Sequence, residues 1–282
     1  MTTHPKKFDQ TLAQQLRQKL DADPFINFLK SRTLFHNIAP AQLPLELLEE
    51  ISRSVQIIRL ARNRQLELQR PPDFIYEIVS GYVKIYDRAP SAAEGEGETG
   101  DDSNPPALLA WRVPGELLGD FKFAFPASRF SDSIIATDEC RLLKVPVETL
   151  HSLGLSHPQV YLNLAGNLAS KAIKTRIRAQ LLRLPNIRCM IARLFIEFLA
   201  ERGYDEAVDE GARARVVNGT FHIRDIAAFL GYEYRQTQTG VHDLIKEDLI
   251  AHYRGNKKSG RFVIRSEEKL RRYLELNAAG AD

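Results

Sequence analysis

The chain has 282 residues, of which 44% are hydrophobic and 27% charged, and its formal net charge is +3 at pH 7. Such a composition is typical of a globular protein with one large or two ordinary domains. No apolar run reaches the roughly 18 residues that a membrane span needs, and the first residues lack the apolar core of a signal peptide. We therefore expect a cytoplasmic protein with no membrane partner.

The cysteines and histidines are too few and too scattered to predict a metal site. Cys140 and Cys189 are the only cysteines, whereas a structural zinc site or an iron–sulfur cluster needs about four ligands. None of the histidines has another histidine four residues away, which is the spacing of a metal site on a helix. Cys140 lies in the apolar run CRLLKV, and we expect it to be a small buried side chain.

Residues 35–157 have the pattern of a β-roll domain, and residues 1–34 precede it as an expected helical extension. Runs rich in Ile, Val, Tyr and Leu alternate with turn residues, which favours an antiparallel barrel or roll. The predicted strands are Ser54–Leu60, Phe74–Val79, Tyr82–Tyr86, Leu108–Val113, Ile134–Ala136 and Arg141–Val145. Segment 88–107 is acidic and has no large apolar residue, so we expect a disordered insertion in a hairpin.

After Pro158 the apolar residues recur at helical spacing, which predicts one long helix over 158–185. One stripe comprises Ala165, Leu168, Ala172, Thr175, Ala179 and Leu182, and a second comprises Ala169, Ile173, Ile177 and Leu181. We expect one stripe to pack on the roll and the other on a second copy of the helix, which makes a homodimer. The alternative is a single broad core stripe on the helix of a monomer.

The same helix carries five basic residues and no acidic residue. They are Lys171, Lys174, Arg176, Arg178 and Arg183. A run of like charge is often a solvated face, and the sequence leaves open whether this one has another role.

Pro185 ends the long helix, and Asn186 is a good N-cap for the next one, which opens a C-terminal domain over 186–282. This second helix has the apolar pattern of a core helix. We expect the acidic segment 202–214 that follows it to be an exposed loop.

Residues 222–250 predict a helix–turn–helix, with Gly231 in the turn. On the second helix one face is apolar and the opposite face is polar. The apolar face has Thr237, Val241, Leu244 and Ile245, and the polar face has Arg235, Gln238, Thr239 and His242, with Gln236 beside them. Arginine and glutamine can each make two hydrogen bonds to one base. The alternative is an ordinary helical hairpin with a polar exterior.

Gly240 lies inside this second helix, where glycine costs about 1 kcal/mol relative to alanine. The sequence leaves two explanations open. The glycine either packs closely against a neighbouring element or allows a close approach to a DNA backbone.

Residues 250–265 read as a strand, a basic turn and a second strand, which completes the order of a winged helix. Arg254, Lys257, Lys258 and Arg261 at the turn suit contacts to phosphates. Together with the polar helix face, this pattern predicts binding to double-stranded DNA.

From Phe35 to Arg265 the chain resembles the Crp/Fnr family of transcription regulators. The resemblance rests on DFIYEIVSGYVKIYDR (73–88), PGELLGDF (114–121), RLLKVPVETL (141–150), the long helix after Pro158 and DIAAFLG (225–231). It implies an α+β protein with a cyclic-nucleotide-binding-type antiparallel β-roll, a dimerisation helix and a C-terminal winged helix-turn-helix. It also implies a homodimer on a two-fold symmetric operator, with RNA polymerase as a further expected partner.

Family members that bind a cyclic nucleotide hold its ribose with a Gly-Glu pair and its phosphate with an Arg-Ser pair. The matching positions here are Gly119 and Asp120 for the first pair, Phe130 and Ser131 for the second with Arg129 one residue early, and Thr175 where the dimer helix meets the adenine. Phenylalanine cannot neutralise a phosphate, so we expect weak or absent binding of simple cyclic nucleotides. The effector stays open: a cyclic nucleotide, another small anion or none. Thr175 has a second interpretation, a bond to its own helix backbone.

The sequence thus predicts a homodimeric DNA-binding transcription regulator in which Arg235, Gln238 and Thr239 read bases, with Gln236 and His242 assisting. The rival hypothesis is an effector-binding or protein-interaction module whose winged helix docks a partner protein. An enzyme is not expected, because no nucleophile–base pair, metal-ligand set or phosphate loop has suitable spacing.

Overall fold

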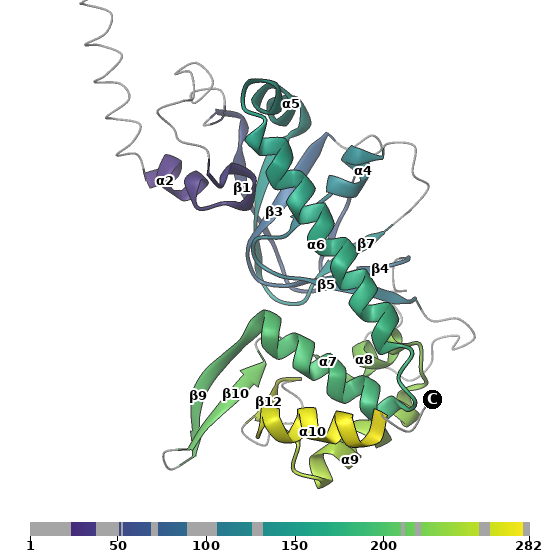
Figure 1. Ribbon diagram of the computed structural model, residues 1–282. Helices are drawn as coiled ribbons and strands as arrows, with labels where there is room; N and C mark the ends of the chain where they lie inside the picture. Colours follow the sequence, from purple (N-terminus) through teal and green to yellow (C-terminus); the bar gives the residue numbers. More distant parts are fainter. Residues whose placement is uncertain are drawn as a thin grey trace, which may run out of the picture. The chain divides into compact units, whose positions relative to one another are not determined.

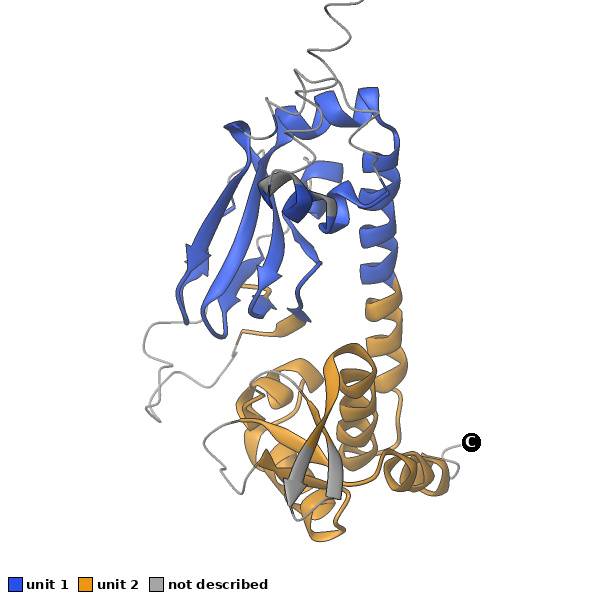
Figure 2. Cartoon of the chain, turned by 90° about the vertical axis from the view of Figure 1, so that its left-hand side faces the viewer, with its two compact units in different colours: residues 1–85, 111–172 blue, residues 86–110, 173–282 orange. Residues whose placement is uncertain are grey.

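A computed structural model describes residues 24–37, 51, 53–68, 73–88, 106–125, 132–209, 212–217, 221–253 and 260–278. The chain divides into two compact units (Figure 2). Unit 1 comprises residues 1–85 and 111–172, and unit 2 comprises residues 86–110 and 173–282. Among the helices that the structure describes, none combines the length and apolar character needed to cross a membrane.

Two four-stranded sheets form the roll (Figure 1), with strand orders β1-β8-β3-β6 and β2-β7-β4-β5. The strands are β1 (Gln56–Leu60), β2 (Gln65–Leu66), β3 (Phe74–Ser80), β4 (Val83–Tyr86), β5 (Leu108–Arg112), β6 (Leu117–Leu118), β7 (Ser133–Ala136) and β8 (Cys140–Pro146). β8 pairs antiparallel with both β1 and β3, and β3 pairs antiparallel with β6. All six predicted strands are confirmed, and β2 and β6 are short additions that the sequence pattern did not predict.

The core of unit 1 lies between the first sheet and three helices, α2 (Pro24–Lys30), α5 (Val147–Ser156) and α6 (Gln159–Leu181). Ile75, Leu143 and Val160 are among its fully buried residues. Cys140 is also fully buried, as predicted. Burial, together with nearby Asp138, raises the pKa of its thiol to about 12.

Glu77 of β3 places a carboxylate beneath the 3₁₀ helix η1 (Thr33–Phe35). Its two oxygens accept hydrogen bonds from the backbone N–H groups of Thr33 (2.9 Å) and Leu34 (3.3 Å). Asn163 of α6 donates to the carbonyl oxygen of Leu34 (3.1 Å). The segment ahead of the roll is therefore held from two sides by polar groups.

The inward face of α6 is apolar at Val160, Leu164 and Leu181 and hydrophilic between them, which corrects the expectation that one of the two predicted stripes packs on the roll. Of the ten residues in the two predicted stripes, only Leu181 is buried. The inward positions are Val160, Leu164, Asn167, Lys171, Lys174, Arg178 and Leu181. They follow steps of three and four, but most are hydrophilic, so a search for apolar periodicity cannot find them.

Unit 2 contains the helices α7 (Ile187–Arg202), α8 (Ile223–Leu230), α9 (Tyr234–Lys246) and α10 (Glu267–Ala278). As predicted, Asn186 caps α7, because its side chain accepts from the N–H of Cys189 at 2.9 Å. Both α9 and α10 pack on α7 (Figure 1), whose Ile191 and Phe195 are fully buried.

The sheet of unit 2 has the order β11-β12-β10-β9. Its strands are β9 (Gly203–Asp209), β10 (Ala212–Val217), β11 (Ile250–His252) and β12 (Phe262–Ile264). The prediction of an exposed loop at 202–214 is therefore wrong, since most of that segment belongs to the paired strands β9 and β10. Arg215 of β10 lies opposite Asp205 of β9, with 3.8 Å between the charged atoms. The acidic character of the segment suggested a loop, but Val216 of β10 is fully buried, and Tyr204 of β9 packs against the same apolar cluster.

Candidate nucleic-acid interface

The helix–turn–helix consists of α8, a turn at Gly231 and α9. Asp225 in the first turn of α8 accepts a hydrogen bond from the backbone N–H of His222 (3.3 Å), which caps that end. Gly231 ends α8 in the left-handed conformation, with φ of 72°. Glycine takes this conformation without steric cost, so the chain can turn sharply into α9.

The two faces of α9 differ in burial as the sequence predicts. Thr237 and Leu244 on the inner face have no exposed surface, and Val241 is 1% exposed. The predicted reading residues, Arg235, Gln236, Gln238, Thr239 and His242, are all exposed. The structure therefore brings the five polar side chains together on one solvent-facing surface. The hydroxyl of Thr239 donates to the carbonyl oxygen of Arg235 (3.0 Å), so its methyl group and lone pairs remain for other contacts.

Two tyrosines extend this surface and were missed in the sequence. Tyr234 is the first residue of α9, and Tyr232 lies in the turn before it. Their side chains are 47% and 37% exposed. The N-terminal residues of a recognition helix are the ones that reach base edges, and this rule could have identified Tyr234 from its position alone.

Gly240 packs against α7, which decides the question that the sequence left open. A Cβ atom at this position would lie 2.9 Å from Cδ1 of Ile191 and 3.4 Å from Cγ2 of Ile187. The first distance is too short for a contact between carbon atoms, and the second is at the limit of an ordinary contact. The absent side chain allows α9 and α7 to approach closely, so the glycine serves the packing of the domain.

The predicted wing is formed by the antiparallel pair β11–β12. Lys257 and Lys258 belong to residues 254–259, which lie outside the described residues. Arg261 stands at the base of the wing, with its guanidinium 4.1 Å from the ring centroid of Tyr253, and it donates to the hydroxyl of Tyr204. Glu206 accepts from both tyrosine hydroxyls (3.0 and 2.6 Å), so this cluster joins the wing to β9.

Arg178 of α6 contacts the first helix of the helix–turn–helix. Its guanidinium donates to the carbonyl oxygens of Phe229 (2.7 Å) and Leu109 (2.8 Å) and lies 4.3 Å from the Phe229 ring centroid. Phe229 is in the last turn of α8, where carbonyl groups have no partner in the helix and the helix dipole is negative. Burial lowers the pKa of Arg178. At the other end of α8 the hydroxyl of Tyr86 donates to Asp225 at 3.3 Å.

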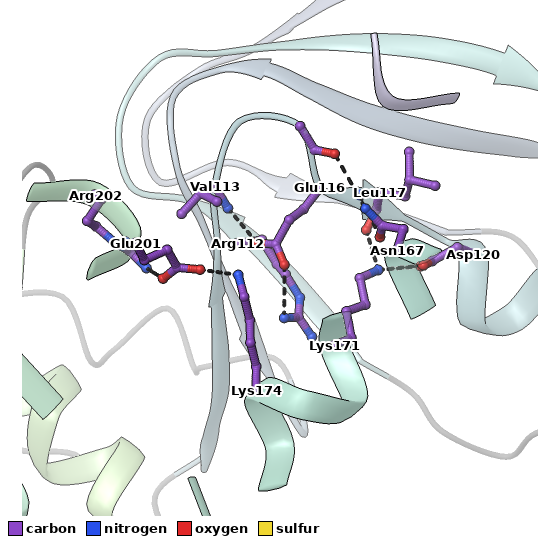
Figure 3. Close-up of polar contacts among 11 residues, drawn as sticks. Arg112, Val113, Glu116, Leu117, Asp120, Asn167, Lys171, Lys174, Glu201 and Arg202 are labelled. Carbon is purple, nitrogen blue, oxygen red and sulfur yellow. Dashed lines mark hydrogen bonds and ion pairs between the residues drawn. The ribbon is translucent and has the colours of Figure 1, made fainter. Parts of the chain in front are cut away.

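Lys174 is also paired within unit 2, since it contacts the carboxylate of Glu201 (Figure 3). The other oxygen of Glu201 accepts from Arg202 at 2.8 Å. Burial acts against ionisation of Glu201, but the two cations outweigh it and hold the pKa of this carboxyl below its ordinary value.

The structure describes only part of the predicted effector site. Arg129 and Ser131 lie outside the described residues, and Thr175 is on the exposed side of α6. Gly119 has a left-handed φ of 84°, and Asp120 beside it is 2% exposed. Both carboxylate oxygens of Asp120 are 2.6 Å from Nζ of Lys171, a partner that the sequence did not indicate (Figure 3).

The described part of this site does not fit a cyclic nucleotide held as the resemblance implies. The carboxylate expected to accept from a ribose hydroxyl is buried and already has a cation as its partner. Among the described residues, no group of three or more His, Cys, Asp and Glu side chains could hold a metal ion.

No protein-family model matches the chain, and no curated protein matches it. Solved structures, however, match most of its length. A mutant of CooA from Carboxydothermus hydrogenoformans is 14% identical with a TM-score of 0.58, and the match covers 80% of this chain and 90% of that one. TTHA1359, a transcriptional regulator of the CRP/FNR family from Thermus thermophilus, is 17% identical with a TM-score of 0.56, covering 79% of this chain and all of the other (100%).

FixK2 from Bradyrhizobium japonicum is 15% identical with a TM-score of 0.55, and the match covers 77% of this chain and 96% of that one. At such identities the likeness concerns the fold. The α+β fold of the chain, antiparallel sheets followed by a long helix and a C-terminal region of helices with a small sheet, is thus that of Crp/Fnr regulators, as the sequence resemblance implies.

Proposed function

We propose that the chain is a transcription regulator that binds double-stranded DNA through the outer face of α9. The observation that carries this proposal is the contrast between the two faces of that helix. Val241 and Leu244 anchor one face in the domain, while long hydrogen-bonding side chains occupy the other. The fold shared with TTHA1359, which is described as a transcriptional regulator, supports the same function.

The residues of the surface have different proposed roles. Arg235 and Gln238 read base edges in the major groove, because each can make two hydrogen bonds to one base. Thr239 reads beside them, and Gln236 and His242 assist. Lys257 and Lys258 contact phosphates, which orient the protein without reading sequence. Arg261 is half-buried and paired with Tyr204 and Tyr253, so it supports the base of the wing instead.

The protein acts as a homodimer through the outer face of α6. Two large apolar side chains are exposed there, Leu162 (63%) and Ile173 (60%). The residues between them on that face are small, Ala165, Gly166 and Ala169, so two helices could approach closely. A second copy of α6 covers these side chains, and the dimer presents two recognition helices to a two-fold symmetric operator.

The test is a titration of a fluorescent random-sequence DNA pool with the full chain at several salt concentrations. Binding should weaken steeply as salt rises, because neutralised phosphates release counterions. Selection from the pool should then enrich a palindromic site with half-sites about one helical turn apart. No binding to any DNA at low salt would overturn the proposal and favour the docking of a partner protein.

Dimerisation has its own measurement, sedimentation velocity of the full chain and of the variant Ile173→Glu. The parent chain should sediment as a dimer and the variant as a monomer, because a charge on the apolar face opposes its burial. A variant as dimeric as the parent would place the interface elsewhere.

A further inference from the structure

The turn between β5 and α4 (Asp120–Ala124) is held by polar side chains of α6, all within unit 1. Asn167 accepts from the backbone N–H of Leu117 (3.3 Å) and donates to the carbonyl oxygen of Gly115 (3.4 Å). Lys171, one turn further along α6, contacts the same segment at Leu117 and Asp120 (Figure 3). One face of α6 therefore fixes the whole stretch 115–120.

The ammonium group of Lys171 has an acceptor for each of its protons. The three acceptors are the two carboxylate oxygens of Asp120 and the carbonyl oxygen of Leu117, each at 2.6 Å. A lysine ammonium has three N–H donors and no acceptor. Its hydrogen bonding is therefore saturated without any ligand.

The pair is also withdrawn from water. The side chain of Asp120 is 2% exposed and that of Lys171 is 14% exposed. Burial lowers the pKa of Lys171, and the neighbouring Asp120 acts in the opposite direction. Removing one member of a buried ion pair leaves the other charge without compensation, so the two residues depend on each other.

The carboxylate of Asp120 also reaches less far from the backbone than a glutamate carboxylate would. The resemblance assigns this position to a glutamate that reaches a ribose hydroxyl, but the aspartate is one methylene shorter. Gly119 before it is close to the strand behind, since a Cβ atom there would lie 3.2 Å from the carbonyl oxygen of Phe74. The turn can hardly move back to make room for a ligand between Asp120 and α6.

We infer that Lys171 is a built-in cation that takes the place of a bound effector at Asp120. The chain itself makes the connection between the roll and α6 that a cyclic nucleotide would otherwise make. The site accordingly binds no cyclic nucleotide, and DNA binding is independent of one. The statement on DNA rests on the proposed function, whereas the statements on Asp120 and Lys171 do not.

The first test is calorimetric titration of the full chain with cyclic AMP and cyclic GMP. We expect no saturable heat up to about 1 mM nucleotide, the weak end of specific binding. Saturable binding in the micromolar range would overturn the inference. This measurement involves no DNA, so its outcome is separate from that of the proposed function.

The second test is chemical rescue of Lys171→Ala, followed by thermal unfolding. The variant should unfold about 5–10 °C below the parent, because Asp120 keeps a buried charge without a partner. n-Propylammonium chloride should restore much of this loss, since the amine can occupy the space of the missing side chain and donate to Asp120. Tetramethylammonium chloride at the same concentration should not, because it has no N–H group.

Lys269→Ala, which removes an exposed lysine of α10, is the matched control and should respond to neither salt. Equal effects of both salts on Lys171→Ala, or no effect of either, would overturn the inference. If Lys171→Ala does not fold, Lys171→Met and the double variant Asp120→Asn/Lys171→Met replace it. The double variant should be the more stable of these two, and the opposite order would contradict the pairing.

Discussion

The helices α6 and α9 both carry a row of hydrophilic side chains, but they use it in opposite ways. In α6 the row faces inward, and Asn167, Lys171 and Arg178 bind acceptors supplied by distant parts of the chain. In α9 the row faces outward, and Arg235 and Gln238 are exposed. Both rows have helical spacing, so spacing alone does not tell a structural cation from one that can bind DNA.

The two rows differ in whether the chain supplies hydrogen-bond acceptors to their side chains. The stretch 158–185 has no acidic residue, yet Asp120 and Glu201 supply carboxylates to its lysines, and Arg178 donates to carbonyl oxygens. A cation that is paired and withdrawn from water contributes to stability and is no longer available to bind a ligand. A cation that stays exposed contributes little to stability and remains able to bind a phosphate or a base.

The largest expected effect is on stability, from Arg178→Met. The change leaves the carbonyl oxygens of Leu109 and Phe229 without their donor and should lower the free energy of unfolding by about 3 kcal/mol. DNA affinity should fall as well, because α8 loses a contact at its C-terminal end. Urea unfolding measures the first effect, with Arg176→Met, at an exposed position of the same helix, as the control. If the two variants were equally stable, the contacts of Arg178 would not contribute to the stability of the fold.

Arg235→Ala should show the reverse behaviour. DNA affinity should fall by about 1–3 kcal/mol, with specificity relaxed at one base pair. The free energy of unfolding should change by less than about 0.5 kcal/mol, because the side chain is exposed. Footprinting and urea unfolding of the same preparation test both statements. A footprint that matches the parent at every position would show that Arg235 does not read DNA.

Gly240→Ala examines the inner face of α9. Alanine favours the helix by about 1 kcal/mol, but overpacking in a dense core costs about 1–3 kcal/mol. The Cδ1 atom of the fully buried Ile191 would have to shift to admit the new Cβ atom, so we expect a net loss of about 1 kcal/mol or less in the free energy of unfolding. Ile191→Val removes the methyl group nearest to the new Cβ atom but itself costs about 0.5–1.5 kcal/mol, so it serves as the reference. Relative to Ile191→Val alone, the added Gly240→Ala should cause no loss, and a loss as large as in the parent background would contradict the packing explanation.

The sequence predicted those parts of the molecule in which one physical signal dominates. The strands of the roll and the two faces of α9 follow from the spacing of apolar residues, and the cap at Asn186 follows from the residue type. The β9–β10 hairpin was missed because its strands are rich in acidic and basic residues, whereas their pairing depends on the backbone ladder. Lys171 was missed because its acceptors lie about 50 residues away in the chain, and no local pattern reports a contact of that kind.

Gly240 and Tyr234 mark two further limits of sequence reasoning. A glycine inside a helix suggests that another group approaches the helix closely at that point. Only the structure identifies the group near Gly240, which is the side chain of Ile191. Tyr234 could have been found, since it occupies the first position of α9, the proposed recognition helix. It was passed over because arginine and glutamine are the residues with a known pairing to single bases.

Glu77 is the counterpart of the α6 cations, a buried carboxylate held by backbone N–H groups, and it gives the smallest expected effect. Burial raises its pKa above the ordinary value of 4.5, although the bonds from Thr33 and Leu34 and nearby Arg32 act against the rise. The folded state therefore binds more protons than the unfolded state between that ordinary value and the raised one. Stability from this group is fully present below the window and is lost as the pH rises through it.

Glu77→Gln keeps an acceptor for the two N–H groups but cannot ionise. The free energy of unfolding of the variant, minus that of the parent, should therefore increase as the pH is raised from about 4.5 to 7. Urea unfolding at several pH values measures this difference, in which the titration of all other groups cancels. A flat difference for Glu77→Gln would mean that this carboxyl titrates alike in the folded and unfolded states, and that the backbone N–H groups of Thr33 and Leu34 offset the full cost of burying its charge.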